Sequence, residues 1–188
     1  MVTLEDVKNN PEVQELIIGA QKQLDALGYT EHSQRHVSIV SNRAGRILET
    51  LGYEKHRIEL AKIAGYLHDI GNGVNRVDHA HSGAILAYNI LKDMGMDVKD
   101  RMEIMSAIGN HDEATGTAVS DISAALILAD KSDVHRDRVV NKNMATFDIH
   151  DRVNYAVTEA NLEIDNVDRK VILDLTIDTK ICPVLDYF

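Results

Sequence analysis

The stretch from Leu67 to Gly71, Leu-His-Asp-Ile-Gly, places two metal-binding side chains, His68 and Asp69, on adjacent residues. The preceding run 58–67 is apolar at helical spacing, and the glycine at 71 ends it. A carboxylate at a buried helix C-terminus faces the negative end of the helix dipole and is destabilised there. Because a bound cation removes that conflict, the pair predicts a metal site if other segments supply further ligands.

Further histidines and acids recur at helix ends and on apolar faces. Asp130 follows the very apolar run 124–129, where an unpaired carboxylate is costly. The single cysteine, Cys182, excludes a cysteine-based zinc site. An all-His/Asp ligand set suits one or two ions of Fe, Mn, Co, Ni or Zn. The histidines close to these acids or on apolar faces are His36, His79, His81 and His111.

Helical periodicity of apolar residues covers most of the chain, and the helices that it predicts must position these residues. Asn10 and Pro11 begin one helix and Gly28 ends it, and Thr30 can cap the next. The most apolar helix, ending near 140, is expected to be the central buried one. The predicted helices span about 4–10, 11–27, 31–51, 55–69, 79–94, 98–110 and 121–140, with loops at 71–78 and 111–120.

The C-terminal part of the chain changes character. Residues 161–165 and 171–178 alternate polar and apolar side chains around a turn at 166–169, which predicts a β-hairpin. A two-stranded hairpin is marginal alone, so it must pack on the helices, be covered by the tail 181–188, or pair with a second copy in a homodimer. The predicted fold is therefore an all-α helical bundle over 1–160 with a C-terminal β-hairpin appendage over 161–188, either part of the same domain or a dimerisation element.

Composition limits the partners. The formal net charge is −10, which argues against a nucleic-acid polymer because that partner needs a broad basic face. No basic segment followed by an apolar run opens the sequence, and no uninterrupted apolar stretch approaches a membrane span. We therefore expect a cytoplasmic protein with no membrane partner.

The ordered pattern His36, His68-Asp69 and Asp130 resembles the HD-domain superfamily of metal-dependent phosphohydrolases. The resemblance covers about residues 30–140 and implies that these four residues bind a first metal ion. His81 and His111 fall where members with two metals have their extra ligands. The closest pattern is that of bacterial HD-domain diadenosine tetraphosphate hydrolases, which have a segment similar to Ala129-Asp130-Lys131 followed by Arg136.

This resemblance implies hydrolysis of a phosphoester in a nucleotide or small phosphorylated metabolite. Metal coordination lowers the pKa of water to about 7, so a metal-bound hydroxide can attack at neutral pH. Asp69, with two carboxylate oxygens, is expected to bridge two ions, and His79 is the best candidate for a general acid. Lys131 and Arg136 could contact the phosphate, Arg136 in bidentate fashion.

Alternatives to this function remain at the level of sequence. Each histidine or acid alone could be a packed or solvated residue. In a one-metal HD nucleotidase, His81 and His111 would be structural. A non-catalytic metal- or nucleotide-binding regulatory HD protein would keep the ligands without turnover. An HD oxygenase with a di-iron site shares the ligand types.

Overall fold

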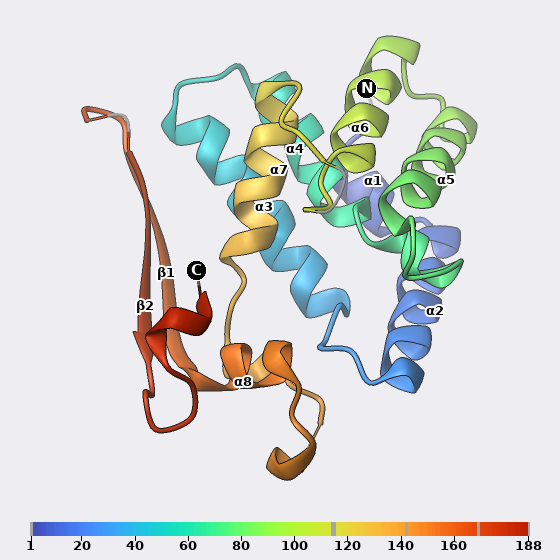
Figure 1. Ribbon diagram of the computed structural model, residues 1–188. Coiled ribbons are helices and arrows are strands. Elements are labelled where there is room, and N and C mark those ends of the chain that lie inside the picture. Colours follow the sequence, from blue (N-terminus) through green and yellow to red (C-terminus); the bar gives the residue numbers. More distant parts are fainter. Residues whose placement is uncertain (1, 114–115, 142, 169, 188) are drawn as a thin grey trace.

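The computed structural model describes residues 2–113, 116–141, 143–168 and 170–187, and Figure 1 shows their arrangement. Residues 114–115, 169 and 188, which fall in the predicted loop, turn and tail, lie outside the described residues. The fold is mainly helical with a C-terminal hairpin, as predicted. Its elements are α1 (Leu4–Lys8), α2 (Pro11–Leu27), α3 (Gln34–Thr50), α4 (Lys55–Leu67), α5 (His79–Asp93), α6 (Val98–Gly109), α7 (Asp121–Ser132), α8 (Ile149–Ala156), β1 (Val157–Asp165), β2 (Lys170–Ile177) and four 3-10 turns, η1 (Ile70–Gly73), η2 (Arg136–Arg138), η3 (Met144–Thr146) and η4 (Val184–Tyr187).

Local signals set several helix ends. The Asn10 side chain accepts a hydrogen bond from the backbone N–H of Glu12, and Gly28 ends α2 in the left-handed region at φ 81°. Ser33, and not the predicted Thr30, caps α3. The prediction that α7 continues to about 140 was wrong, because Asp133 leaves the helical conformation at φ −83° and ψ 68°.

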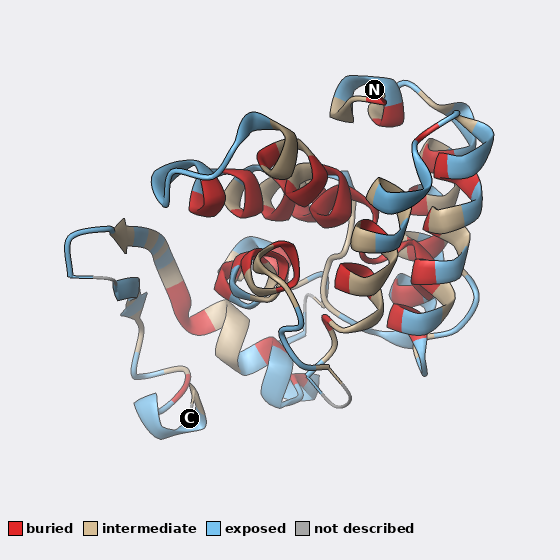
Figure 2. Cartoon of the chain, turned by 90° about the horizontal axis from the view of Figure 1, so that it is seen from above, coloured by how far each residue is buried: buried red, intermediate tan, exposed pale blue. Residues whose placement is uncertain are grey.

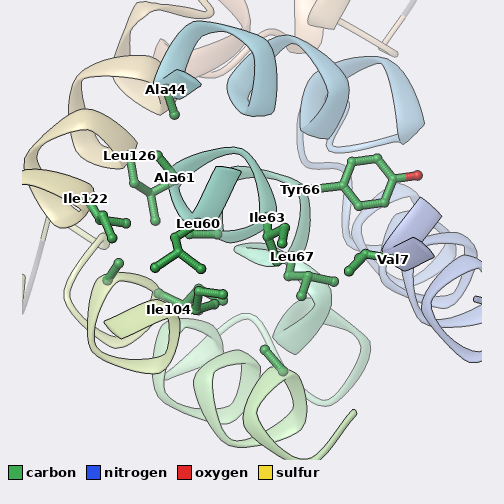
Figure 3. Packing of buried hydrophobic residues seen from close by; sticks show 14 of the residues in the cluster. Val7, Ala44, Leu60, Ala61, Ile63, Tyr66, Leu67, Ile104, Ile122 and Leu126 are labelled. Atoms are coloured by element: carbon green, nitrogen blue, oxygen red, sulfur yellow. The ribbon is translucent and has the colours of Figure 1, made fainter. Parts of the chain in front are cut away.

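The central helix is α4, which corrects the expectation that α7 takes this place. Helix α4 contacts α1, α3, α6 and α7 and is buried on most of its circumference. In Figure 3, Leu60, Ala61 and Ile63 of α4 lie among side chains from the surrounding helices. Leu128 of α7, by contrast, is 39% exposed, so this apolar helix has one outward face.

Two glycines allow the helices to approach closely where the site forms. A Cβ on Gly65 of α4 would lie 2.9 Å from Cα of Ser41 on α3. A Cβ on Gly71 of η1 would clash with the carbonyl oxygen of His79, at the start of α5. These contacts hold the end of α4 against the middle of α3, and η1 against the start of α5.

The hairpin follows α8, a short helix that periodicity did not predict. Its strands are antiparallel, with Leu162 opposite Leu173 and Ile164 opposite Val171, and β1 begins four residues earlier than expected, at Val157. Figure 2 shows buried residues concentrated on the inward faces of the helices, whereas most of the hairpin is intermediate or exposed. Within the described ranges, no helix is long and apolar enough to cross a membrane.

Candidate metal centre

Side chains from α3, α7 and the end of α4 converge beside the core. His36 lies in the first turn of α3, His68 is the C-cap of α4, and Asp130 lies in the last turn of α7. His36 Nε2 lies 3.3 Å from Asp130 Oδ1, and His68 Nε2 lies 3.6 Å from the same oxygen. Asp69 Oδ2 lies 3.5 Å from His36 Nε2 and 3.2 Å from His68 Nε2. The four predicted first-metal ligands therefore meet at one point.

The atoms at this point lack partners. His36 Nε2, His68 Nε2 and Asp69 Oδ2 are buried and make no hydrogen bond within the described structure. Buried polar atoms are normally bonded, because an unpaired one costs free energy. Ligands about 2.1 Å from a common ion stand roughly 3–3.5 Å apart, which matches the spacing of these donors. The residues therefore fit a divalent cation.

Hydrogen bonds at the other ring nitrogen fix the tautomer of each histidine. Backbone carbonyls and carboxylates only accept, so a histidine that bonds them through Nδ1 carries its proton there and presents the Nε2 lone pair. The Nδ1 partners are Asp133 Oδ2 for His36 (2.8 Å), Gly65 O for His68 (2.9 Å), Arg76 O for His79 (3.1 Å) and Ile108 O for His111 (2.6 Å).

A second group of donors adjoins the first on the side of α5 and α6. His68, Asp69 and His111 bring ligand atoms within 4.8 Å of one another. His79 Nε2 lies 3.6 Å from Asp69 Oδ1, and the His79 and His111 ring centres are 5.1 Å apart. Asp69 therefore turns Oδ2 toward the first group and Oδ1 toward His79. Asn72 also donates to Asp69 Oδ1, at 2.9 Å.

The expected ligand His81 is not brought to this cluster. Its side chain is 55% exposed and lies 3.5 Å from the Asp78 carboxylate. Residues two apart on a helix point about 200° from each other, so only one of His79 and His81 can face the site. The structure therefore places His79, and not His81, beside Asp69.

The electrostatics of the cluster favour a cation. Burial opposes protonation of His68, but Asp69 and Asp130 outweigh it and raise its pKa. The same two carboxylates would stabilise any cation at this point. Burial lowers the pKa of His111 to about 4 and also lowers that of His79, so both rings are neutral at pH 7, as metal ligation requires.

A cavity of about 190 Å³ opens beside the donors, between the helical core and α8. Lys131 lines it, with Nζ 3.0 Å from Glu113 and 3.3 Å from Asp130. The predicted phosphate ligand Arg136 does not line it, since its guanidinium lies over the Tyr155 ring, 5.4 Å from the ring centre. The arginines that line the cavity are Arg76 and Arg138.

The HD domain family model matches residues 34–144, more than half of the chain and all of the converging ligands. The chain belongs to the HD domain family. This result confirms the superfamily resemblance. The crystal structure of a predicted HD superfamily hydrolase from an uncultured Thermotogales bacterium is 30% identical, covers 66% of this chain and 67% of that chain, and superposes with a TM-score of 0.51.

A curated protein is also similar over part of the chain. The uncharacterized protein MJ1020 from Methanocaldococcus jannaschii is 31% identical over 60% of this HD-domain chain. The chain spans about half of that relative's length, 51%.

The structure also brings residues to this HD-domain site that sequence reasoning missed. Asp133 orients His36, and Arg138 donates to the Asp133 carbonyl at 2.8 Å. His32 lines the cavity, and burial lowers its pKa to about 3. Asp151 of α8 lines it as a buried carboxylate. The position of Asp133, three residues after Asp130 in the sequence, was the one signal available for this group.

Proposed function

We propose that the protein is a metal-dependent phosphohydrolase acting on a nucleotide or small phosphorylated metabolite. The observation that carries this proposal is the set of three buried, unbonded donor atoms, on His36, His68 and Asp69, beside a cavity lined by both cationic and acidic side chains. His36, His68, Asp69 and Asp130 would hold one ion. Asp69, His79 and His111 would hold a second.

A divalent ion bound here would supply Lewis acidity and lower the pKa of a coordinated water. The chain's own groups orient the donors and the substrate. Asn72 fixes the Asp69 carboxylate, and Asp133 fixes the His36 ring. Lys131 and Arg76 offer positive charge to a phosphate in the cavity. The lowered pKa of His79 suits a neutral ligand better than the general acid expected from sequence.

The far wall of the cavity limits the substrate. Asp148, Asp151 and Asn154 line it from α8 and its N-cap, and Asp112 and Glu113 line it near Lys131. These acceptors repel a second anionic group and favour hydroxyl or amine donors. A substrate with one phosphate near the metals and a sugar beyond it fits this cavity better than an extended polyphosphate such as diadenosine tetraphosphate.

A substrate panel tests the proposal. Metal-free protein reconstituted with Mn, Fe or Co is assayed against nucleoside monophosphates, sugar phosphates, phosphodiesters and diadenosine tetraphosphate. We expect metal-dependent phosphate release, fastest with monophosphates and abolished by Asp130→Ala. Bound metal without turnover on any substrate would instead indicate a regulatory binding protein. Full activity with one ion per chain would indicate a one-metal nucleotidase.

A further inference from the structure

The two outer edges of the hairpin differ in the hydrogen bonds that they receive from other segments. The outer edge of β1 faces the helices, where Arg43 donates to Ala160 O at 3.4 Å and His135 Nε2 lies 3.0 Å from Thr158 O. The outer edge of β2 receives no hydrogen bond from any other segment in the described ranges. In Figure 1, β2 stands on the side away from α3 and α7. Unpaired backbone groups on a regular strand form a template for another strand.

The side chains at this edge are apolar and exposed. Val171 is 42% exposed, Ile172 43% and Leu173 38%. The C-terminal tail does not cover them, because η4 packs on α8 and the Tyr187 hydroxyl donates to Val153 O at 2.6 Å. The tail therefore does not cover this edge, and the chain's own helices contact the β1 side of the hairpin, which leaves the outer edge of β2 for pairing with another chain.

We propose that β2 pairs with β2 of a second copy, antiparallel, with Ile172 on the two-fold axis. In this register Lys170 lies opposite Asp174 of the partner subunit, and Val171 lies opposite Leu173 of the partner subunit. By symmetry both pairs occur twice. The charge pattern of the strand is therefore complementary to itself.

Other registers do not place these opposite charges across from each other. Centring the pairing on Leu173 places Asp174 opposite the partner's Ile172, and centring it on Asp174 places two carboxylates together. A one-residue slip turns the apolar face of one copy against the polar face of the other. Only the register centred on Ile172 joins unlike charges and keeps the faces aligned.

The paired hairpins form a four-stranded sheet with one continuous apolar face. Leu162 and Ile164 already pack against the helical core of their own chain, and Leu173 and Val171 lie opposite them. Pairing extends this row across the two-fold axis and covers the exposed edge. Four strands with an apolar face are stable where two are marginal.

A charge-swap series measured by sedimentation equilibrium tests the dimer and its register together. Wild-type protein should show a mass twice 20.9 kDa at tens of micromolar. Asp174→Lys should raise the dissociation constant of the dimer about tenfold. The substitution places a positive charge opposite Lys170 of the partner subunit, and by symmetry this repulsion occurs twice. Adding Lys170→Asp to that variant should restore dimerisation. Ile172→Lys, which places two ammonium groups on the axis, should give monomer.

The control is Glu159→Lys, an equal charge change at an exposed residue of β1, which should leave the mass unchanged. Metal content should be the same in every variant, so this test stands apart from the proposed activity. A wild-type monomer at 100 µM refutes the dimer. A dimer that Asp174→Lys and Ile172→Lys leave intact refutes this interface.

Discussion

At the scale of single residues, the site depends on which atom each side chain leaves unbonded. Asn72 occupies Asp69 Oδ1 and leaves Oδ2 toward His36 and His68. Asp133 accepts a hydrogen bond from Nδ1–H of His36, so the Nε2 lone pair points inward. Such supporting partners tune ligand orientation and basicity. These neighbours orient the donor atoms of the proposed metal site.

His79 and His81 form a matched pair for testing the second group of donors. His79→Ala should reduce bound metal from about two ions per chain to about one, because a two-metal site needs ligands for both ions. His81→Ala should leave metal content and activity unchanged, since its side chain is 55% exposed. Elemental analysis and a phosphatase assay measure both. The opposite result, with loss only in His81→Ala, would restore the sequence-based assignment.

The sequence predicted a cluster of His36, His68, Asp69, Asp130 and His111, but it assigned the α5 ligand to His81, whereas the structure places His79 beside Asp69. The choice depends on the rotational phase of α5, which the close contact of Gly71 with the His79 carbonyl sets. Asn72 and Asp133 were missed for a related reason. Their roles are hydrogen bonds across elements, which periodicity does not encode.

At the scale of elements, the site depends on how closely α3 and α4 pack. Gly65→Ala would place a Cβ 2.9 Å from Ser41 Cα. Overpacking of this kind costs about 1–3 kcal/mol, and separating the helices should also weaken metal binding. Denaturant unfolding and metal titration measure the two effects.

Gly19→Ala is the matched control, because a Cβ there meets nothing within 4 Å. It should stabilise α2 by up to about 1 kcal/mol. Equal effects of the two substitutions on stability and metal affinity would contradict the role given to the α3–α4 contact.

Arg57 and Asp121 tie the start of α4 to the start of α7, with Arg57 Nε donating to Asp121 at 2.5 Å. This bond lowers the pKa of Asp121 in the folded state. Its stabilisation is therefore present above the unfolded pKa, near 3.9, and is lost as pH falls through the folded pKa. Asp121→Asn should cost less than about 1 kcal/mol at pH 7, since the pair is partly exposed.

The difference in free energy of unfolding between wild type and Asp121→Asn should shrink as pH falls from 5 toward 3. Urea unfolding over this pH range measures it. A difference that stays constant to pH 3 would show that the carboxylate charge contributes nothing.

Helices with strong caps and apolar stripes were predictable, as α2 shows with Asn10, Pro11 and Gly28. Helix α8 was not, because it has only eight residues, four of them polar, and its position depends on contacts with η2, β1 and η4. The cavity wall that α8 supplies was therefore invisible in the sequence. The over-long α7 arose because Asp133 ends that helix through tertiary bonds.

At the scale of the whole molecule, the helical core and the hairpin serve different roles. The core brings together the proposed ligands at the start of α3, the ends of α4, α6 and α7 and the start of α5. The hairpin presents the edge of β2, which is unpaired within the described ranges. The architecture of a helical bundle with a hairpin was predictable, because the hydrophobic pattern changes near residue 160 from helical spacing to alternation. The central place of α4 did not, because apolar content does not reveal how many neighbours a helix has.

The most direct test of the metal centre is elemental analysis of reconstituted wild-type protein beside Asp69→Ala. Asp69 faces both groups of donors, with Oδ2 3.2 Å from His68 Nε2 and Oδ1 3.6 Å from His79 Nε2. We predict about two ions per chain in the wild type and loss of both in the variant, with circular dichroism unchanged. A wild-type protein that binds no metal, or a variant that keeps both ions, would contradict the shared centre.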